Sequence, residues 1–248
     1  LGDIGYKHAG PALIVCATDS LNPTVVRIAA STALGKIGMD ANPSNLSAQQ
    51  TVVANRFYAG ENSLQPQPIG GLNLFWKWDG ENQLVALDIP EEVFFDVMAM
   101  YYASEALGTD VDNATAMSTF VGANLRRNRA LAGRNDLVYG DLAYSPEFYA
   151  TVFGPKIAQL VLTTSLQDGD TPLVLDSIKA LSKTAGADAL LQSGSQPIVV
   201  AMQYPDKRVQ YEAALTLAST LPNSYFEGSY RVVPLLASAV RSGGDLFA

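Results

Sequence analysis

The chain has 248 residues, 48% of them hydrophobic and 16% charged, so it can bury a sizeable core as one large domain or two small ones. Its formal net charge of −8 repels phosphate backbones and anionic membrane surfaces, which argues against nucleic acid and such membranes as partners. The single cysteine excludes an internal disulfide framework, and no stretch approaches the roughly 20 apolar residues of a membrane span.

The first feature along the chain is a repeat. The pentapeptide LGDIG at 1–5 returns as LGKIG at 34–38. The first copy has the form of the end of a repeat whose beginning is missing, so we expect the chain to be a piece of a longer protein. The second copy closes a complete unit: an apolar helix GPALIVCATDS, a turn NPTVV, and a second helix RIAASTALGKIG. In this second helix Val26, Ala30 and Leu34 form one stripe at helical spacing.

A polar stretch at 40–71, rich in Pro, Asn, Gln and Gly, is expected to be a linker. Within it we expect one helix that begins near Ser47, with this serine as its N-cap. Alternating apolar residues then flank Asp79-Gly80, a dipeptide typical of two-residue hairpin turns. This pattern predicts a short antiparallel hairpin across 72–89.

One face of the predicted hairpin carries Leu74, Trp76 and Trp78. Because an isolated hairpin is marginally stable in water, we expect this aromatic face to pack on a helix. The alternative is that Trp76 and Trp78 are exposed and contact another protein, since tryptophan is favoured at interfaces.

Three helices are predicted after the hairpin. The first spans 90–108, with Pro90 in its first turn, and its antiparallel mate spans 113–133. This pair loosely resembles a tetratricopeptide-type (TPR-like) helical hairpin. The third helix runs to about residue 166, with Ser145 as its N-cap and a kink at Gly154-Pro155.

The C-terminal part returns to the plan of two helices per unit. SQPIVVAMQY is a first helix, PDKR a turn and VQYEAALTLASTL a second helix, and RVVPLLASAVRSGG begins a further unit. Upstream, TPLVLDSIKALSKTAG supplies one more second-helix pattern. The corresponding residues Leu173 and Val209 give a spacing of about 36, which fits two-helix solenoid repeats.

Two of these stretches, NPTVVRIAASTALGKIG and PDKRVQYEAALTLA, resemble HEAT repeats, in which a turn is followed by V-R-x-x-A-A-x-A-L. The second departs at Gln210, where the family usually has an arginine that helps neighbouring turns to stack, so the resemblance implies that this repeat stacks differently. The order of the whole chain resembles long HEAT-repeat proteins of planctomycete bacteria, a resemblance that carries no activity.

The expected fold is therefore all-α: an α-solenoid of HEAT-like helical hairpins with a small β-hairpin insert and a TPR-like helix pair. We expect HEAT-like repeats at 1–39 and 167–248, a linker with the hairpin insert at 40–89, and the helical hairpin region at 90–166. Both ends should expose apolar stacking surface, because terminal solenoid repeats need polar caps. The resemblance implies a bacterial protein of the cytoplasm or the periplasm.

No residues have the pattern of a catalytic, cofactor or metal site. His8 is the only histidine, too few for a hydrolase triad or a multi-histidine metal site, and we expect it at the surface or as a cap. Cys16 is expected to be a small core residue. Glu91 and Glu92 point about 100° apart on a helix and do not converge on one substrate. DVDN at 110–113 lacks the glycine and distal glutamate of a calcium loop, so helix capping explains its acids.

A basic cluster, Arg126, Arg127 and Arg129 within NLRRNRALAGR, stands out in an acidic chain. We expect it to be a helix end whose charges favour the C-terminal dipole and pair with carboxylates of a neighbouring helix. The alternative is a docking site for an acidic partner protein.

The expected function is a non-catalytic scaffold or assembly module, because stacked helical repeats present an extended surface that usually binds proteins. The candidate protein-contact residues are Trp76, Trp78, Arg126, Arg127 and Arg129, with no cofactor, and end-to-end self-association is also considered. Two alternatives stay open. An enzyme resembling HEAT-like phycobilin lyases would bind a tetrapyrrole and absorb visible light, and a nucleic-acid-binding HEAT protein would shift DNA in a salt-sensitive way.

Overall fold

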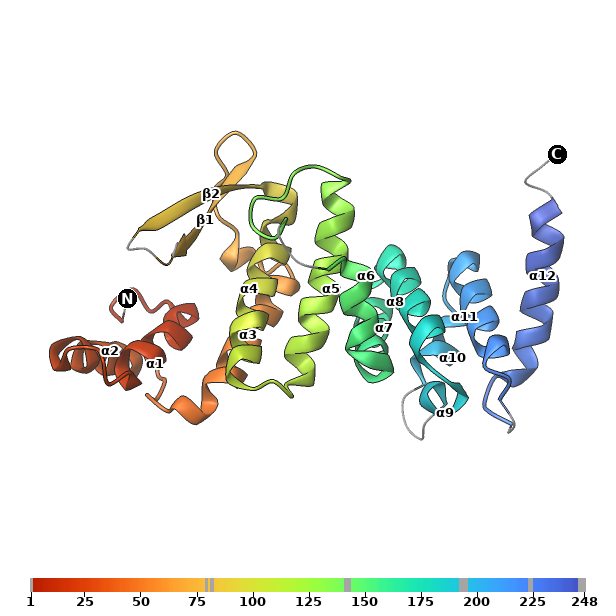
Figure 1. Cartoon of the computed structure of the whole chain (residues 1–248), viewed down its shortest axis with the longest axis horizontal. Helices are drawn as coiled ribbons and strands as arrows, with labels where there is room; N and C mark the ends of the chain where they lie inside the picture. The colour runs from red at the N-terminus through yellow and green to blue at the C-terminus, as the bar shows by residue number, and fades with distance from the viewer. Residues whose placement is uncertain are drawn as a thin grey trace. The chain divides into compact units, whose positions relative to one another are not determined.

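The computed structural model (Figure 1) describes residues 2–78, 80, 83–140, 144–191, 196–222 and 225–244. The fold is mostly helical (67%), with one small two-stranded antiparallel sheet, as the sequence predicted. The chain forms two compact units, Leu1–Ala123 and Asn124–Ala248. The boundary between the units falls within helix α5 (Ala114–Leu131).

The first unit contains four complete helices and both strands. These are α1 (Gly10–Thr18), α2 (Thr24–Lys36), α3 (Leu46–Tyr58), β1 (Leu72–Trp78), β2 (Leu84–Pro90) and α4 (Phe94–Thr109). A short 3-10 turn, η1 (Lys7–Ala9), precedes α1, and three more lie between the later elements: η2 (Pro43–Asn45), η3 (Asn62–Leu64) and η4 (Glu91–Val93).

Helices α1 and α2 pack against each other around a small apolar core. α1 is apolar over almost its whole length, whereas α2 buries Ala30 and Leu34 on one face. Val26, the first residue of the predicted stripe, is 39% exposed. Pro23 is the N-cap of α2, and Gly38 follows its end with a φ of +73°, a left-handed conformation that favours glycine.

Helix α3 lies in the core of the first unit although its sequence is polar. It packs against α4, where the Phe57 and Tyr102 rings stack with their centroids 5.6 Å apart. Ser47 was expected to be the N-cap but is the second residue of α3, and its hydroxyl donates a 3.0 Å hydrogen bond to the Ala106 carbonyl of α4. The Asn113 side chain donates a 2.9 Å bond to the same hydroxyl. Because these polar groups are satisfied internally, a polar helix can be buried.

The predicted β-hairpin is confirmed. β1 and β2 pair antiparallel, with Phe75 opposite Leu87 at the centre of the ladder and Trp76 opposite Ala86 beside them. Of the predicted turn dipeptide, Gly80 has a φ of +85°, which suits a hairpin turn, and Asp79 lies outside the described residues. The helix predicted after the hairpin begins later than expected, because Pro90 is the last residue of β2 and a 3-10 turn follows it.

The second unit contains the end of α5 and seven further helices. These are α6 (Pro146–Val152), α7 (Gly154–Asp168), α8 (Thr171–Thr184), α9 (Ala187–Leu190), α10 (Pro197–Ala201), α11 (Lys207–Ser219) and α12 (Val232–Gly244), the last preceded by η5 (Ser229–Arg231). Ser145 caps α6 as predicted, accepting a hydrogen bond from the Phe148 amide. The predicted kink is a complete break, because Gly154 has a φ of +81°.

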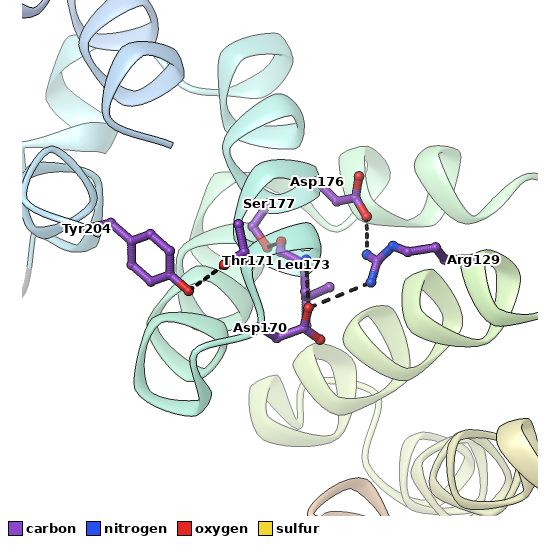
Figure 2. Close-up of polar contacts among 7 residues, drawn as sticks. All are labelled: Arg129, Asp170, Thr171, Leu173, Asp176, Ser177 and Tyr204. Carbon is purple, nitrogen blue, oxygen red and sulfur yellow. Dashed lines mark hydrogen bonds and ion pairs between the residues drawn. The ribbon is translucent and has the colours of Figure 1, made fainter. Parts of the chain in front are cut away.

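Helices α8 and α11 begin with the same cap and bury the same stripe. Their N-caps, Asp170 and Asp206, each accept a backbone N–H of the first turn, which Figure 2 shows for Asp170 and Leu173. The third residues after the caps, Leu173 and Val209, are at most 1% exposed. The buried stripe continues at the seventh and eleventh residues after each cap: Ser177 and Leu181 in α8, Ala213 and Leu217 in α11. The predicted correspondence of these two helices is confirmed.

Helices α8 and α11 make most of the helix contacts in the second unit. α8 contacts α7 and α11, α10 contacts α7 and α11, and α12 packs on α11. A hydrogen bond of 2.9 Å joins the Thr171 hydroxyl in the first turn of α8 to the Tyr204 hydroxyl ahead of α11 (Figure 2). Helices α8 and α11 therefore contact each other, and each also contacts a helix that precedes it, α7 and α10 respectively.

Arg27 and Gln210, at the same position of α2 and α11, make similar contacts. The Arg27 Nε donates a 3.4 Å hydrogen bond to the Ala17 carbonyl near the end of α1. The Gln210 Nε2 donates a 2.6 Å bond to the Tyr204 carbonyl, just after α10. Both side chains thus bind a carbonyl oxygen at the C-terminal side of the preceding helix, where carbonyls lack helical partners.

Candidate protein-contact surface

The β-hairpin packs on the first unit through one face only. Alternate side chains of a strand point to opposite faces, and the buried ones in β1 are Asn73 and Phe75. The Phe75 ring meets Tyr101 of α4 edge to face, with ring centroids 5.6 Å apart. Burial raises the pKa of Tyr101, as expected for a phenol partly removed from water. Figure 1 shows the two strands beside the helices of this unit.

The other face of the hairpin is exposed, so the expectation that it packs on a helix is wrong. Trp76 and Trp78 are 56% and 57% exposed, and Leu74 is 52% exposed. The physical reason is that Phe75, on the opposite face, already supplies the aromatic contact with α4. The alternative interpretation, in which the two tryptophans are free to contact another protein, fits this geometry.

The exposed face continues across both strands. Leu84 lies opposite Trp78 and is 60% exposed, Ala86 lies opposite Trp76, and Asp88 lies opposite Leu74. We call this surface the hairpin face and define it by seven residues: Leu72, Leu74, Trp76, Trp78, Leu84, Ala86 and Asp88. Six of them are apolar, and Asp88 is its one charged member. Sequence reasoning missed Leu72, Leu84, Ala86 and Asp88, although alternation along β1 would have placed Leu72 there and pairing across the predicted turn the other three.

Charges around the hairpin face are mainly negative. Residues 69–92 contain five acidic residues and one lysine, so the stretch has a net charge of 1 − 5 = −4. Lys77 alternates with the two tryptophans and therefore belongs to the other face of β1. The hairpin face is thus an apolar surface on a stretch of net negative charge, with the carboxylate of Asp88 on the face itself.

Arg129, a candidate contact residue, is paired within the second unit. Figure 2 shows its guanidinium between two carboxylates of α8 and its cap: Nη2 lies 2.5 Å from Asp176 Oδ2 and Nη1 lies 3.7 Å from Asp170 Oδ1. These side chains are 23–39% exposed, so the pairs hold α5 to α8 with a modest energy, about 0–1 kcal/mol each. The expected pairing with carboxylates of a neighbouring helix is what the structure shows for Arg129.

The other two arginines are less exposed than Arg129. Arg127 is only 4% exposed, forms an ion pair with Asp136, and has its guanidinium carbon 5.1 Å from the centre of the Tyr139 ring. Arg126 is half-buried. The structure therefore does not bring the arginines together as one exposed basic patch, and the hairpin face is the better candidate for protein contact.

His8 is buried, which corrects the expectation of a surface or capping role. It is 8% exposed in η1, its ring lies 4.9 Å from that of Tyr6, and neither ring nitrogen has a hydrogen-bond partner among the described residues. Burial lowers the pKa of His8, the Arg56 cation lowers it further, and the Glu61 carboxylate acts in the opposite direction. A hydrogen bond from Arg56 in turn lowers the pKa of Glu61 to about 2.

The remaining residues weighed for chemistry have structural surroundings. Cys16 is half-buried against the core of α1 and α2. In the DVDN run, the Asp110 carboxylate accepts a hydrogen bond from the backbone N–H of Asp112, and the Asn113 side chain accepts one from the backbone N–H of Ala116. These bonds are the predicted capping of α5. Glu91 lies in η4 and not in the first turn of α4.

Among the residues that the structure describes, no group of three or more His, Cys, Asp or Glu side chains is placed to hold a metal ion. No helix in the same part of the chain has the length and apolar character needed to cross a bilayer. No protein-family model, curated protein or solved structure matches this chain.

Proposed function

We propose that this chain is a non-catalytic protein–protein interaction module built from HEAT-like helical hairpins, and that it binds its partner through the hairpin face. Helices α2, α8 and α11 bury the seventh and eleventh residues after their caps, in support of the repeat interpretation, although the third residue is buried in α8 and α11 and exposed in α2. The contacts of α7, α8, α10 and α11 are those expected when neighbouring hairpins stack.

The observation that carries the proposal is the exposure of both tryptophans of the chain on one surface. A half-exposed tryptophan presents about 100 Å² of side chain, and three leucines extend the same surface. Contiguous apolar patches of about 300–600 Å² on monomers are often functional. Tryptophan is also enriched among the residues that contribute most to binding energy. Since the opposite face already anchors the hairpin, these side chains are available for a partner.

Site-specific photocrosslinking tests the proposal. A photoreactive amino acid at Leu84, on the hairpin face, is expected to capture a partner in extracts of the source cells. The same amino acid at Lys77, on the other face of the hairpin, is the matched control and is expected to capture much less. Capture at Leu84 should be lost when Trp76→Ser is added, and the purified partner should then bind the wild-type chain directly.

Equal capture at the two positions, or capture that survives Trp76→Ser, would place the contact elsewhere on the chain. Circular dichroism of Trp76→Ser should match the wild type, because Trp76 is 56% exposed and its loss leaves Phe75 in place. A folded variant thus separates loss of contact from loss of structure.

A further inference from the structure

The residues of the hairpin face also turn their backbone groups away from the paired strands. Leu72 exchanges two hydrogen bonds with Ile69, of 3.0 and 3.2 Å, so its N–H and C=O point away from β2. Alternate residues of an antiparallel strand point their backbone groups to the same side. The register therefore turns the groups of Leu84, Ala86 and Asp88 away from β1, at the outer edge of β2.

This outer edge of β2 is open. Among the described residues, no hydrogen bond reaches the outward N–H or C=O groups of Leu84, Ala86 or Asp88. Pro90 has the same orientation at the end of the strand, where a residue without an N–H is tolerated because its nitrogen faces outward. The outer edge of β1, in contrast, is closed at its first residue by Ile69.

The side chains beside this edge suit an added strand. Ala86 is small and separates the edge from Trp76, so an apolar side chain of an incoming strand can lie across Ala86 and reach the indole ring. Asp88 ends the same row and offers a carboxylate. The preferred incoming strand therefore has apolar side chains at its centre and a cationic side chain at its end.

The charge of the chain favours a basic partner over a second copy. Two copies, each with a net charge of −8, repel one another, and two hairpin stretches bring −4 to the same place. A segment with lysine or arginine beside its apolar residues is instead attracted to this surface. The free edge calls for an extended segment, since only a strand satisfies a row of outward backbone groups.

We infer that the hairpin binds its partner by strand addition: an extended, basic segment of another protein pairs with β2 over Leu84–Asp88 as a third strand. This inference rests on the proposed function and specifies its partner. Backbone hydrogen bonds give the affinity, the tryptophan–leucine face selects apolar side chains, and the carboxylate of Asp88 selects a cationic side chain.

Synthetic peptides test strand addition on the whole chain. The probe is acetylated, amidated Lys-Val-Thr-Val-Thr-Val-Lys, whose valines share one face of a strand. Binding is expected to shift the tryptophan emission to shorter wavelength, because both tryptophans of the chain lie on the hairpin face. Binding should also slow hydrogen exchange at the outward amides of Leu84 and Ala86, while the inward amide of Leu87 stays protected throughout.

Matched peptides separate the contributions. Methylation of alternate amide nitrogens, on the valines in one control and on the threonines in another, leaves charge and side chains unchanged. At least one of the two is expected to bind tenfold more weakly or worse. A peptide with glutamates in place of the lysines should also bind at least tenfold more weakly. If both methylated peptides bind as well as the parent, strand addition is refuted.

Variants of the chain give an independent test. Asp88→Lys should weaken binding of the basic peptide at least threefold. Asp168→Lys, an equal charge change in the second unit, should leave this binding unchanged. Ala86→Pro removes an outward N–H and should abolish binding. If Ala86→Pro unfolds the hairpin, Asp88→Lys and the methylated peptides still decide the outcome.

The outcomes distinguish this inference from the function on which it rests. No binding of the parent peptide, together with partner capture at Leu84, overturns strand addition and leaves the contact surface intact. Failure of both overturns both. An emission shift that depends on protein concentration alone identifies a second copy as the occupant and overturns the basic-segment proposal.

Discussion

Asp3 and Lys36 occupy the same position in the two copies of the repeated pentapeptide, and their side chains form an ion pair of 2.5 Å. The separation of 33 residues is the offset of the repeat itself. A hydrogen bond from Lys36 lowers the pKa of Asp3, and both side chains are exposed. The two copies of the sequence therefore lie side by side in space, as adjacent turns of stacked repeats do.

The contact between these copies predicts opposite effects for two equivalent glycines. In Gly2→Ala the new Cβ would lie 2.8 Å from the Cα of Ala33 and 3.2 Å from its carbonyl oxygen, a clash that backbone must relieve. We expect this substitution to destabilise the chain by about 1 kcal/mol or more. Gly35→Ala meets no atom within 4 Å and should stabilise α2 by about 0.4–1 kcal/mol.

Urea titration of the two glycine variants measures both effects. Hydrogen exchange at the amide of Gly5, which donates a 3.1 Å bond to the Gly2 carbonyl, should also quicken in Gly2→Ala. A destabilising Gly35→Ala, or a neutral Gly2→Ala with unchanged exchange, would contradict this account of the contact.

Ala213→Leu is expected to destabilise the second unit by roughly 1–3 kcal/mol, because Ala213 is fully buried in α11 and a larger side chain has no room there. Ala30, at the corresponding position of α2, is 5% exposed and should respond in the same direction. Ala29→Leu is the matched control. Ala29 precedes Ala30 in α2 and is exposed, so this substitution should change the free energy of unfolding by about half a kcal/mol or less. A denaturant midpoint that Ala213→Leu leaves unmoved would show that the shared register is wrong.

Neighbouring aromatic residues of β1 should respond differently to truncation. Phe75 is 5% exposed and packs on Tyr101, so Phe75→Ala should cost about 3–5 kcal/mol or detach the hairpin. Trp76→Ala should cost less than about 1 kcal/mol. Thermal unfolding followed by circular dichroism compares the two, and strong quenching of the wild-type emission by the neutral quencher acrylamide should confirm the exposed face. A reversed order of stabilities would invert our assignment of the two faces.

The buried His8 should make stability depend on pH. Since its folded pKa is lowered from 6.5, the unfolded chain takes up a proton first as the pH falls. Stability is therefore full above about pH 6.5 and declines below it until the pH reaches the lower folded pKa. Glu61, with its pKa at about 2, stays ionised throughout this window.

Urea titrations between pH 5.5 and 7.5 measure the effect of His8. His8→Leu should remove the decline, and it should not weaken the chain at pH 7.5, because neither ring nitrogen is hydrogen-bonded among the described residues. The same decline in wild type and His8→Leu would mean that another group is responsible.

Helices such as α8 could be predicted because their apolar residues recur at helical spacing, as in the stripe from Leu173 to Leu181. The hairpin could be predicted from alternation, but not the face that packs. Alternation divides β1 into two sets, and the more apolar set, with Trp76 and Trp78, is the exposed one. The choice depends on Tyr101, which offers its ring to Phe75 from a helix about 25 residues away.

The burial of α3 in the core could not be predicted from the sequence either. Its polar residues read as a linker, because what satisfies them lies far along the chain: Ser47 bonds to Ala106, and Thr119 bonds to Asn55 at 2.6 Å. Arg129 shows the same limitation. The pattern predicted carboxylate partners on a neighbouring helix, but only the packing of α8 identifies Asp170 and Asp176.

Both α8 and α11 begin with an aspartate N-cap, which makes the segment between the two caps removable. Excision of residues 170–205 would join Gly169 directly to Asp206, so α11 would follow α7 with an aspartate N-cap in the same place that Asp170 has now. The buried stripe would keep its phase, since Val209 would take the position of Leu173. Recombination at these two turns could therefore lengthen or shorten the chain, and each exchange would keep the aspartate cap and the phase of the buried stripe.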